Sequence, residues 1–240
     1  GAHTCATLAD ETARCWGLNG QGQLGNGTTD VAFAPVAVTS PPGAVSVVAG
    51  ANFSCALFTG GVAQCWGSDG SGQLAAGTGD NSSTTPVNVT DLSGATGLGA
   101  SSSRLCAVNA DATVSCAGFG AGTSLAQVLT PVPAATGLSS IAVGLNHSCG
   151  RTTAGGVLCW GLNQDGQLGR ISDTTTIQPS GVVPGLSGVV ELAAAGSHTC
   201  ATTTLGAVVC WGGYGLETPP PSVDVTAGTA TANSAGGNHI

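Results

Sequence analysis

Lysine is absent from this 240-residue sequence, and its only strongly basic side chains are four scattered arginines: Arg14, Arg104, Arg151 and Arg170. Against them stand 12 acidic residues, which gives a net charge of −8. The chain therefore has no basic stripe that could neutralise the phosphates of a nucleic acid or the headgroups of an anionic membrane. We expect no nucleic-acid partner.

Long apolar runs are also lacking. No stretch approaches the roughly 18 residues that a membrane-spanning helix needs, so we expect no membrane insertion. The first five residues lack the basic and apolar regions of a signal peptide, and we expect the sequence to be a mature or trimmed product. Only 7% of residues are charged and 4% aromatic, but 42% are hydrophobic, which is too apolar for a disordered chain. Short Val, Ala and Leu runs between turn residues, with 40 glycines, predict many short strands.

Ten cysteines fall into five pairs, and the two members of each pair stand ten positions apart. The pairs are Cys5 and Cys15, Cys55 and Cys65, Cys106 and Cys116, Cys149 and Cys159, and Cys200 and Cys210. Turn residues such as Asp10–Glu11 or Gly60–Gly61 lie midway, so each pair frames a β-hairpin. Directly opposed residues in an antiparallel hairpin have Cα atoms about 4.5–5.5 Å apart, near the range that a disulfide bridges. The spacing therefore predicts five structural disulfides, one in each hairpin.

Other roles for these cysteines fit less well. No C-x-x-C occurs, which argues against a zinc ribbon, a thioredoxin-type redox pair and haem attachment. A free, buried pair in each hairpin is the remaining alternative, but it leaves the identical spacing unexplained. Disulfides persist in oxidising compartments, so we expect a secreted protein, extracellular or attached to the cell surface.

The cysteine pairs belong to longer repeats, with 50, 51, 43 and 51 residues from one first cysteine to the next. Cys-Trp-Gly closes four of the pairs, and Gly-Gln-Leu follows at 22–24, 72–74 and 166–168. Self-similarity at this period is typical of arrays and propellers. We predict a single domain over 1–240 whose repeats, each of four short strands, occupy about 1–50, 51–101, 102–144, 145–195 and 196–240.

The motif C-W-G-L-N-x-x-G-Q-L-G, at Cys15–Gly25 and Cys159–Gly169, resembles the RCC1-type repeat in its bacterial secreted variety with paired cysteines. The resemblance covers nearly the whole chain and implies an all-β fold, a β-propeller of five RCC1-like four-stranded blades with one disulfide per blade. Members of the family are commonly seven-bladed, and two of the five repeats here are degenerate. A closed five-bladed ring is within the range of propellers, and a fragment of a larger ring is the alternative.

The C-terminal segment 229–237 predicts a strand that closes on the first blade or on a neighbouring copy, which would protect a sheet edge. Beyond it, Gly237-Asn-His-Ile repeats the register of Gly1-Ala-His-Thr, and one molecule cannot place both segments at one site. The overlap therefore indicates either a longer parent chain or strand exchange between copies, which could build assemblies.

Polar residues recur at fixed places in the repeat, so we assign them structural roles. The histidines (His3, His147, His198 and His239) are expected to make structural hydrogen bonds, since one per blade cannot converge on a site unless all line the channel. Asn19 and Asn163 are expected to fix turns, the tryptophans to pack in the core, and Gln23, Gln73 and Gln167 to satisfy backbone groups between blades. We predict no catalytic residue, no metal site, no cofactor and no enzyme activity.

Three aromatic residues stand at positions that the other repeats do not share: Phe33, Phe119 and Tyr214. Loop residues of this kind carry binding function in repeat scaffolds, so we predict them as binding residues. The leading hypothesis is an extracellular, non-catalytic binding or structural module with a protein partner or self-association through its terminal strand. The alternatives are an inhibitor of a secreted enzyme such as a β-lactamase, through one loop face, and a propeller enzyme such as a lyase.

Overall fold

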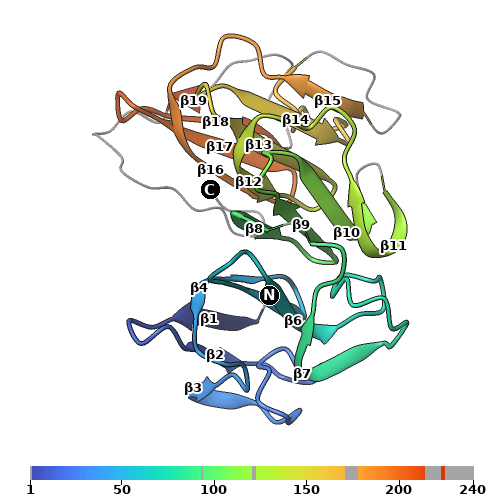
Figure 1. The fold of residues 1–240 in the computed structure, drawn as a ribbon. Coiled ribbons are helices and arrows are strands. Elements are labelled where there is room, and N and C mark those ends of the chain that lie inside the picture. Colours follow the sequence, from blue (N-terminus) through green and yellow to red (C-terminus); the bar gives the residue numbers. More distant parts are fainter. Residues whose placement is uncertain (1, 93, 121–122, 171–177, 214–222, 225–240) are drawn as a thin grey trace. The chain divides into compact units, whose positions relative to one another are not determined.

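The computed structural model describes residues 2–92, 94–120, 123–170, 178–213 and 223–224, and its regular elements are β-strands (Figure 1). They form five antiparallel sheets, which we call blades 1 to 5 in chain order. The chain divides into two compact units, of which the first contains blades 1–3 and the second blades 4 and 5.

In the first unit, blade 1 has three strands and blades 2 and 3 have four each. Blade 1 consists of β1 (His3–Thr7), β2 (Ala13–Gly17) and β3 (Ala32–Ala37). Blade 2 consists of β4 (Ala44–Ala49), β5 (Phe53–Phe58), β6 (Ala63–Ser68) and β7 (Ser82–Asn88). Blade 3 consists of β8 (Gly97–Ala100), β9 (Arg104–Val108), β10 (Val114–Gly120) and β11 (Thr123–Pro131).

In the second unit, both blades have four strands in chain order across the sheet. Blade 4 consists of β12 (Leu138–Val143), β13 (His147–Thr152), β14 (Val157–Gly161) and β15 (Gln178–Val182). Blade 5 consists of β16 (Val189–Ala195), β17 (His198–Thr203), β18 (Val208–Gly212) and β19 (Val223–Asp224).

The blades are offset from the sequence repeats by one strand. Strand β4 ends the first repeat, but it pairs with β5 of the second, and Ala49 lies opposite Ser54. The connection between them is short enough for the Gly50 N–H to donate to the Phe53 carbonyl at 2.8 Å. Each later blade thus begins with the last strand of the preceding repeat. Within the described residues, blade 1 has no such strand, and β1 lies at the edge of its sheet.

The cysteines pair as their spacing predicts, one disulfide in each blade. Cys5 lies opposite Cys15 in the β1–β2 hairpin, and the same register recurs at Cys149 and Cys159. The Cα atoms of the five bridged pairs are 4.0–4.1 Å apart, and no cysteine is free. Each bridge therefore closes a local hairpin and crosslinks no two blades.

The backbone conformation explains why glycine follows Cys-Trp in the repeat. The pairing of β6 with β7 shifts register between Cys65 and Gly67, so the strand bulges at the tryptophan. At Gly67 φ is +103°, and a Cβ there would lie 2.5 Å from the carbonyl oxygen of Asn52. Gly17 shows the same, with φ at +108° and the Ala2 carbonyl at 2.5 Å. Only glycine fits this conformation and this close backbone approach.

Candidate functional site

The Gly-Gln-Leu turns are held by the side chains of the preceding motif. The Leu24 N–H donates to Asn19 Oδ1 at 3.0 Å, as predicted for a turn-fixing asparagine. The glutamine side chain folds back into its own turn, where Gln23 Oε1 accepts the Gln21 N–H at 2.9 Å. We predicted that these glutamines satisfy backbone groups between blades, and for their side chains this is wrong. Each side-chain oxygen instead accepts a backbone N–H of its own turn. The glutamine's main-chain carbonyl remains available for the next blade.

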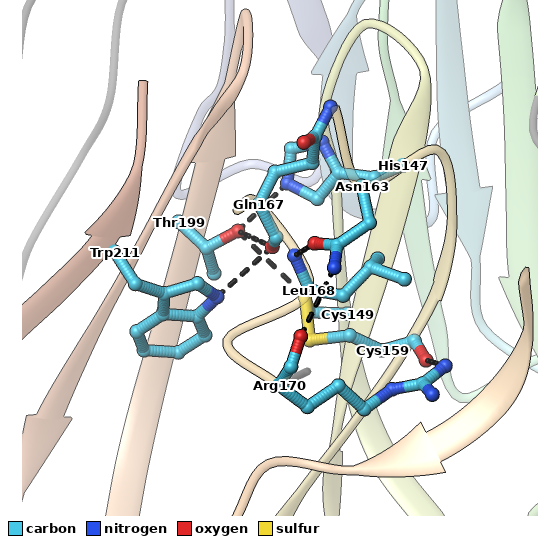
Figure 2. Close-up of a disulfide and its surroundings, with 9 residues drawn as sticks. All are labelled: His147, Cys149, Cys159, Asn163, Gln167, Leu168, Arg170, Thr199 and Trp211. Atoms are coloured by element: carbon cyan, nitrogen blue, oxygen red, sulfur yellow. Dashed lines mark hydrogen bonds between the residues drawn. A yellow bond between two sulfur atoms is a disulfide. The ribbon is translucent and has the colours of Figure 1, made fainter. Parts of the chain in front are cut away.

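Blades 4 and 5 meet through that carbonyl, as Figure 2 shows beside the Cys149–Cys159 bridge. The Trp211 Nε1–H donates to the Gln167 oxygen at 2.9 Å. The Thr199 hydroxyl lies 3.4 Å from the same oxygen and 2.7 Å from His147 Nε2. We call this arrangement the blade joint: histidine and glutamine carbonyl from one blade, hydroxyl and tryptophan from the next.

The same joint connects blades 1 and 2. The Trp66 Nε1–H and the Ser54 hydroxyl donate to the Gln23 carbonyl at 2.9 and 3.0 Å, and His3 Nε2 lies 2.8 Å from the Ser54 oxygen. Burial and the charge of the nearby amino terminus lower the pKa of His3, against a smaller opposing effect of a hydrogen bond with the Phe53 backbone. The structural role predicted for His3 and His147 is confirmed. His239 lies outside the described residues.

Blades 2 and 3 meet through apolar side chains instead. Phe53 stands at the histidine position, Leu105 at the hydroxyl position and Ala117 at the tryptophan position, and all three are fully buried in one cluster. Ala75, also buried there, stands where the polar joints have Gly25 and Gly169. At those two glycines a Cβ would lie within 2.8 Å of Trp66 and 3.0 Å of Trp211, so the extra methyl of Ala75 is compatible only with the missing tryptophan.

The histidine position of blade 3 holds Arg104, which is 1% exposed. Its Nε–H donates to the Phe119 carbonyl at 3.3 Å. Burial lowers the pKa of this guanidinium to about 10, which leaves it charged at neutral pH. Arg104 is therefore tied to its own blade's hairpin, and the sequence motif did not anticipate it.

Blade 2 carries a carboxylate where the other two turns have asparagine. Asp69 Oδ1 accepts the Leu74 N–H at 2.8 Å, as Asn19 and Asn163 do in their turns. Burial raises the pKa of Asp69, the Leu74 N–H lowers it by less, and the negative charge of Asp80 adds to the rise. The carboxylate therefore performs the asparagine's structural role at some cost in stability.

Some of the exposed apolar residues lie at the end of the blades beyond Cys-Trp-Gly. Leu18 and Phe119 occupy the same place in blades 1 and 3, because each N–H donates at 2.9 Å to the backbone just before the first strand of the hairpin. They are 53% and 59% exposed. On blade 1, Leu18 and Val31 flank the Gly17–Ala32 pair, and Phe33 follows at 93% exposure. We call Leu18, Val31 and Phe33 the rim patch. Tyr214 lies outside the described residues.

In the part of the chain that the structure describes, no three or more His, Cys, Asp or Glu side chains come together as metal ligands. Nor does this part contain a helix of the length and apolarity that crossing a membrane requires.

Repeated four-stranded blades joined through turn carbonyls and tryptophans define the class of repeat β-propellers. Family models of the regulator of chromosome condensation (RCC1) repeat match residues 15–57 and 154–202, and a second RCC1 repeat model matches 44–73 and 138–167. Together these matches cover more than half of the sequence. The chain belongs to the RCC1 repeat family, and its fold is the all-β fold of that family's propellers.

Solved structures agree on the fold. Yeast RCC1 (Prp20), in a complex with Kap60, is 22% identical with a TM-score of 0.73, over 90% of this chain and 55% of its own. Human WBSCR16 is 20% identical with a TM-score of 0.74, over 88% of this chain and 59% of its own. The ectodomain of the Arabidopsis receptor kinase ACR4 is 22% identical with a TM-score of 0.53, over 90% of this chain and 68% of its own. This chain thus spans little more than half the length of the first two.

Proposed function

We propose that this chain is an extracellular, non-catalytic module that binds a protein through the rim patch of its first blade. The observation that carries the proposal is that the recurring polar side chains are buried, whereas large apolar side chains are exposed on blade 1. The recurring polar groups, such as His147 and Asn163, are buried in joints and turns. Among the residues that the structure describes, the most exposed large apolar residue is Phe33, on a strand where the other repeats have no aromatic residue.

A protein partner fits the chemistry of the rim patch. Leu18, Val31 and Phe33 offer aliphatic and aromatic surface without a basic side chain among them, and aromatic residues are enriched in the cores of protein interfaces. The net charge of −8 disfavours nucleic acid. The relatives supply precedent, since yeast Prp20 binds Gsp1p and histones and is bound by Kap60.

The extracellular location rests on the sulfur chemistry. All ten cysteines are paired in local bridges, and disulfides of this number are rare in reducing compartments. The fold is also used outside the cell, because the ACR4 relative is an ectodomain. The absence of a catalytic role is proposed because His3 and His147 serve joints and the buried Asp69 serves a turn.

Self-association is the second part of the proposal. Strand β1 lies at a sheet edge among the described residues, whereas β5, β13 and β17 each pair with a preceding strand. We propose that the segment 229–237, from the same chain or a neighbouring copy, pairs with β1. In blades 2, 4 and 5 the residue opposite the first cysteine is Val48, Ala142 or Ala193, and the segment is rich in such small residues.

The binding proposal can be tested by affinity capture from the secreted proteins of the source cells. Immobilised chain should retain a discrete protein, and Phe33→Ser should lose it. Leu205→Ser is the matched control, because Leu205 is 88% exposed but lies on the hairpin turn of blade 5. Inhibition of purified secreted enzymes, β-lactamases included, would identify the partner as an enzyme. Equal retention by both variants, or no retention above background, would refute the assignment of the rim patch.

A further inference from the structure

The outer strands of blades 1 and 2 leave the sheet in the same way. In blade 1 the N–H and the hydroxyl of Thr39 both donate to the Gly25 carbonyl at 2.9 Å. In blade 2 the N–H and the hydroxyl of Thr90 both donate to the Ala75 carbonyl, also at 2.9 Å. The threonine thus ties the residue after the Gly-Gln-Leu turn to the chain that leads to the next blade.

Blade 4 has a proline at this position. The Val183 N–H donates to the carbonyl two residues before the second cysteine of its hairpin, as the Val38 N–H does in blade 1. The next residue, Pro184, is therefore the counterpart of Thr39. Proline has no amide N–H and no hydroxyl, so Pro184 cannot donate to the carbonyl of Gly169. No other residue that the structure describes donates to that carbonyl, which leaves a hydrogen-bond acceptor open.

A small pocket lies at this glycine, between blades 4 and 5. Its volume is about 120 Å³, and it is lined by Gly169 and the side chains of Val183, Pro184, Leu186, Val209 and Trp211. A Cβ on Gly169 would lie 3.0 Å from both Val183 Cγ1 and Trp211 Nε1, so the glycine backbone lies between these two walls. Pro184 is exposed, so the pocket is open to solvent beside it.

The walls of the pocket define the chemistry of a ligand. No charged residue lines the pocket, so a charged ligand would lose its hydration there without compensation. The walls are aliphatic and aromatic, and an apolar cavity of about 150 Å³ holds one benzene molecule. The carbonyl of Gly169 adds a single hydrogen-bond acceptor. One hydrocarbon ring with one hydroxyl group therefore matches the pocket in size and in polarity.

We propose that this pocket binds a phenol ring, with the phenol hydroxyl donating to the Gly169 carbonyl. The ring packs against the indole of Trp211, whose own N–H already donates to the Gln167 carbonyl and so does not compete for Gly169. The site goes beyond the proposed function, because it lies on blades 4 and 5 and takes a ligand of one ring. The phenol is either a free small molecule or the tyrosine side chain of a peptide, and the test separates these two sources.

Titration of the isotopically labelled chain with p-cresol, followed by NMR at the tryptophan indole N–H signals, tests the site. We expect a saturable shift of the Trp211 signal, assigned with a Trp211→Phe chain. The Trp66 signal should not move, because Thr39 occupies the carbonyl in that joint. Toluene lacks the hydroxyl and should bind about fivefold more weakly, which corresponds to one net hydrogen bond. N-acetyltyrosinamide should shift Trp211 if the source is a peptide, and p-cresol alone should shift it if the source is a free phenol.

Pro184→Thr restores the Val-Thr pair of blades 1 and 2, so its N–H and hydroxyl should occupy the Gly169 carbonyl and weaken p-cresol binding about fivefold. Pro133→Thr, the same change after the corresponding valine of blade 3, lies outside the pocket and should bind like the original chain. Val209→Phe should fill the pocket and abolish the shift.

Three results would overturn the inference: no saturable shift of Trp211 by either phenol, equal affinity for toluene and p-cresol, or unchanged binding by Pro184→Thr. Partner capture through Phe33 does not involve this pocket, so the two proposals fail separately.

Discussion

A single side chain holds each Gly-Gln-Leu turn, and in blade 2 this side chain is the carboxylate of Asp69 instead of an asparagine amide. Its Oδ1 accepts the Leu74 N–H as an asparagine would, but the charge is buried. Asn19 and Asn163 provide the same acceptor without a charge, and their Nδ2–H groups also donate, to the carbonyls of Thr28 and Arg170. One substitution in this turn of blade 2 should therefore raise the free energy of unfolding.

Asp69→Asn should stabilise the chain by about 1 kcal/mol at neutral pH, the value of one net hydrogen bond. Because the fold raises the pKa of Asp69, folding binds a proton there, and the free energy of unfolding falls as pH rises above the ordinary value of 3.8. The advantage of Asp69→Asn should therefore shrink as pH falls through the raised pKa of Asp69 toward 3.8, and should be smallest below that value. Urea unfolding at several pH values measures it. Asn19→Asp is the reverse change and should destabilise; equal stability of all three chains would contradict the interpretation.

At the scale of strands and turns, the joints show compensation across blades. Phe53, Leu105 and Ala117 together replace the histidine, the hydroxyl and the tryptophan of the polar joint, so no hydroxyl or indole is left without its partner. Ala75 replaces the glycine beside that tryptophan. An unpaired buried donor costs about 1–3 kcal/mol, which makes a half-converted joint worse than either complete form. The apolar joint is therefore a complete alternative way of packing two blades, and not a polar joint that has lost some of its residues.

Gly25 and Trp66 should show this coupling. Gly25→Ala alone places a methyl 2.8 Å from the indole at φ +66° and should cost about 1–3 kcal/mol. Trp66→Ala alone leaves a cavity and should cost about 3–5 kcal/mol. The double variant resembles the Ala75 and Ala117 pair of the natural apolar joint, so it should cost less than the sum. Thermal unfolding of the four chains gives the coupling energy, and strict additivity would show that the two positions do not compete for space.

The sequence predicted the elements whose partners are close in the chain. Cysteines ten positions apart gave the hairpins and the bridges, and Asn19 was correctly placed in its turn. The offset between repeats and blades was missed, because a periodic sequence can be divided anywhere, and only the short connection at Gly50 makes β4 pair forward. The sequence analysis interpreted the residues of the apolar joint as degenerate repeats. Phe53 and Leu105 are far apart in the chain and come into one cluster only in the folded protein.

At the scale of the whole chain, the five bridges are not equally protected. Cys5, on the edge strand β1, is half-buried, whereas the other nine cysteines are at most 3% exposed. Thiolate attack requires access to a sulfur, so burial should determine the order of reduction.

Limited treatment with a water-soluble thiol, followed by alkylation and peptide mass mapping, should therefore label Cys5 and Cys15 before any other pair. Cys55 and Cys65, fully buried in the next blade, are the internal comparison. Simultaneous reduction of all five bridges would mean that access requires global unfolding, and earlier reduction of another bridge would contradict the burial pattern.

The central claim is that the repeat's polar residues join consecutive blades. A double-mutant cycle on His147 and Thr199, with the changes His147→Phe and Thr199→Val, tests it most directly. We predict a coupling energy of about 1 kcal/mol in the free energy of unfolding, as expected for one net hydrogen bond across the joint. Additive effects at these two positions would contradict the claim.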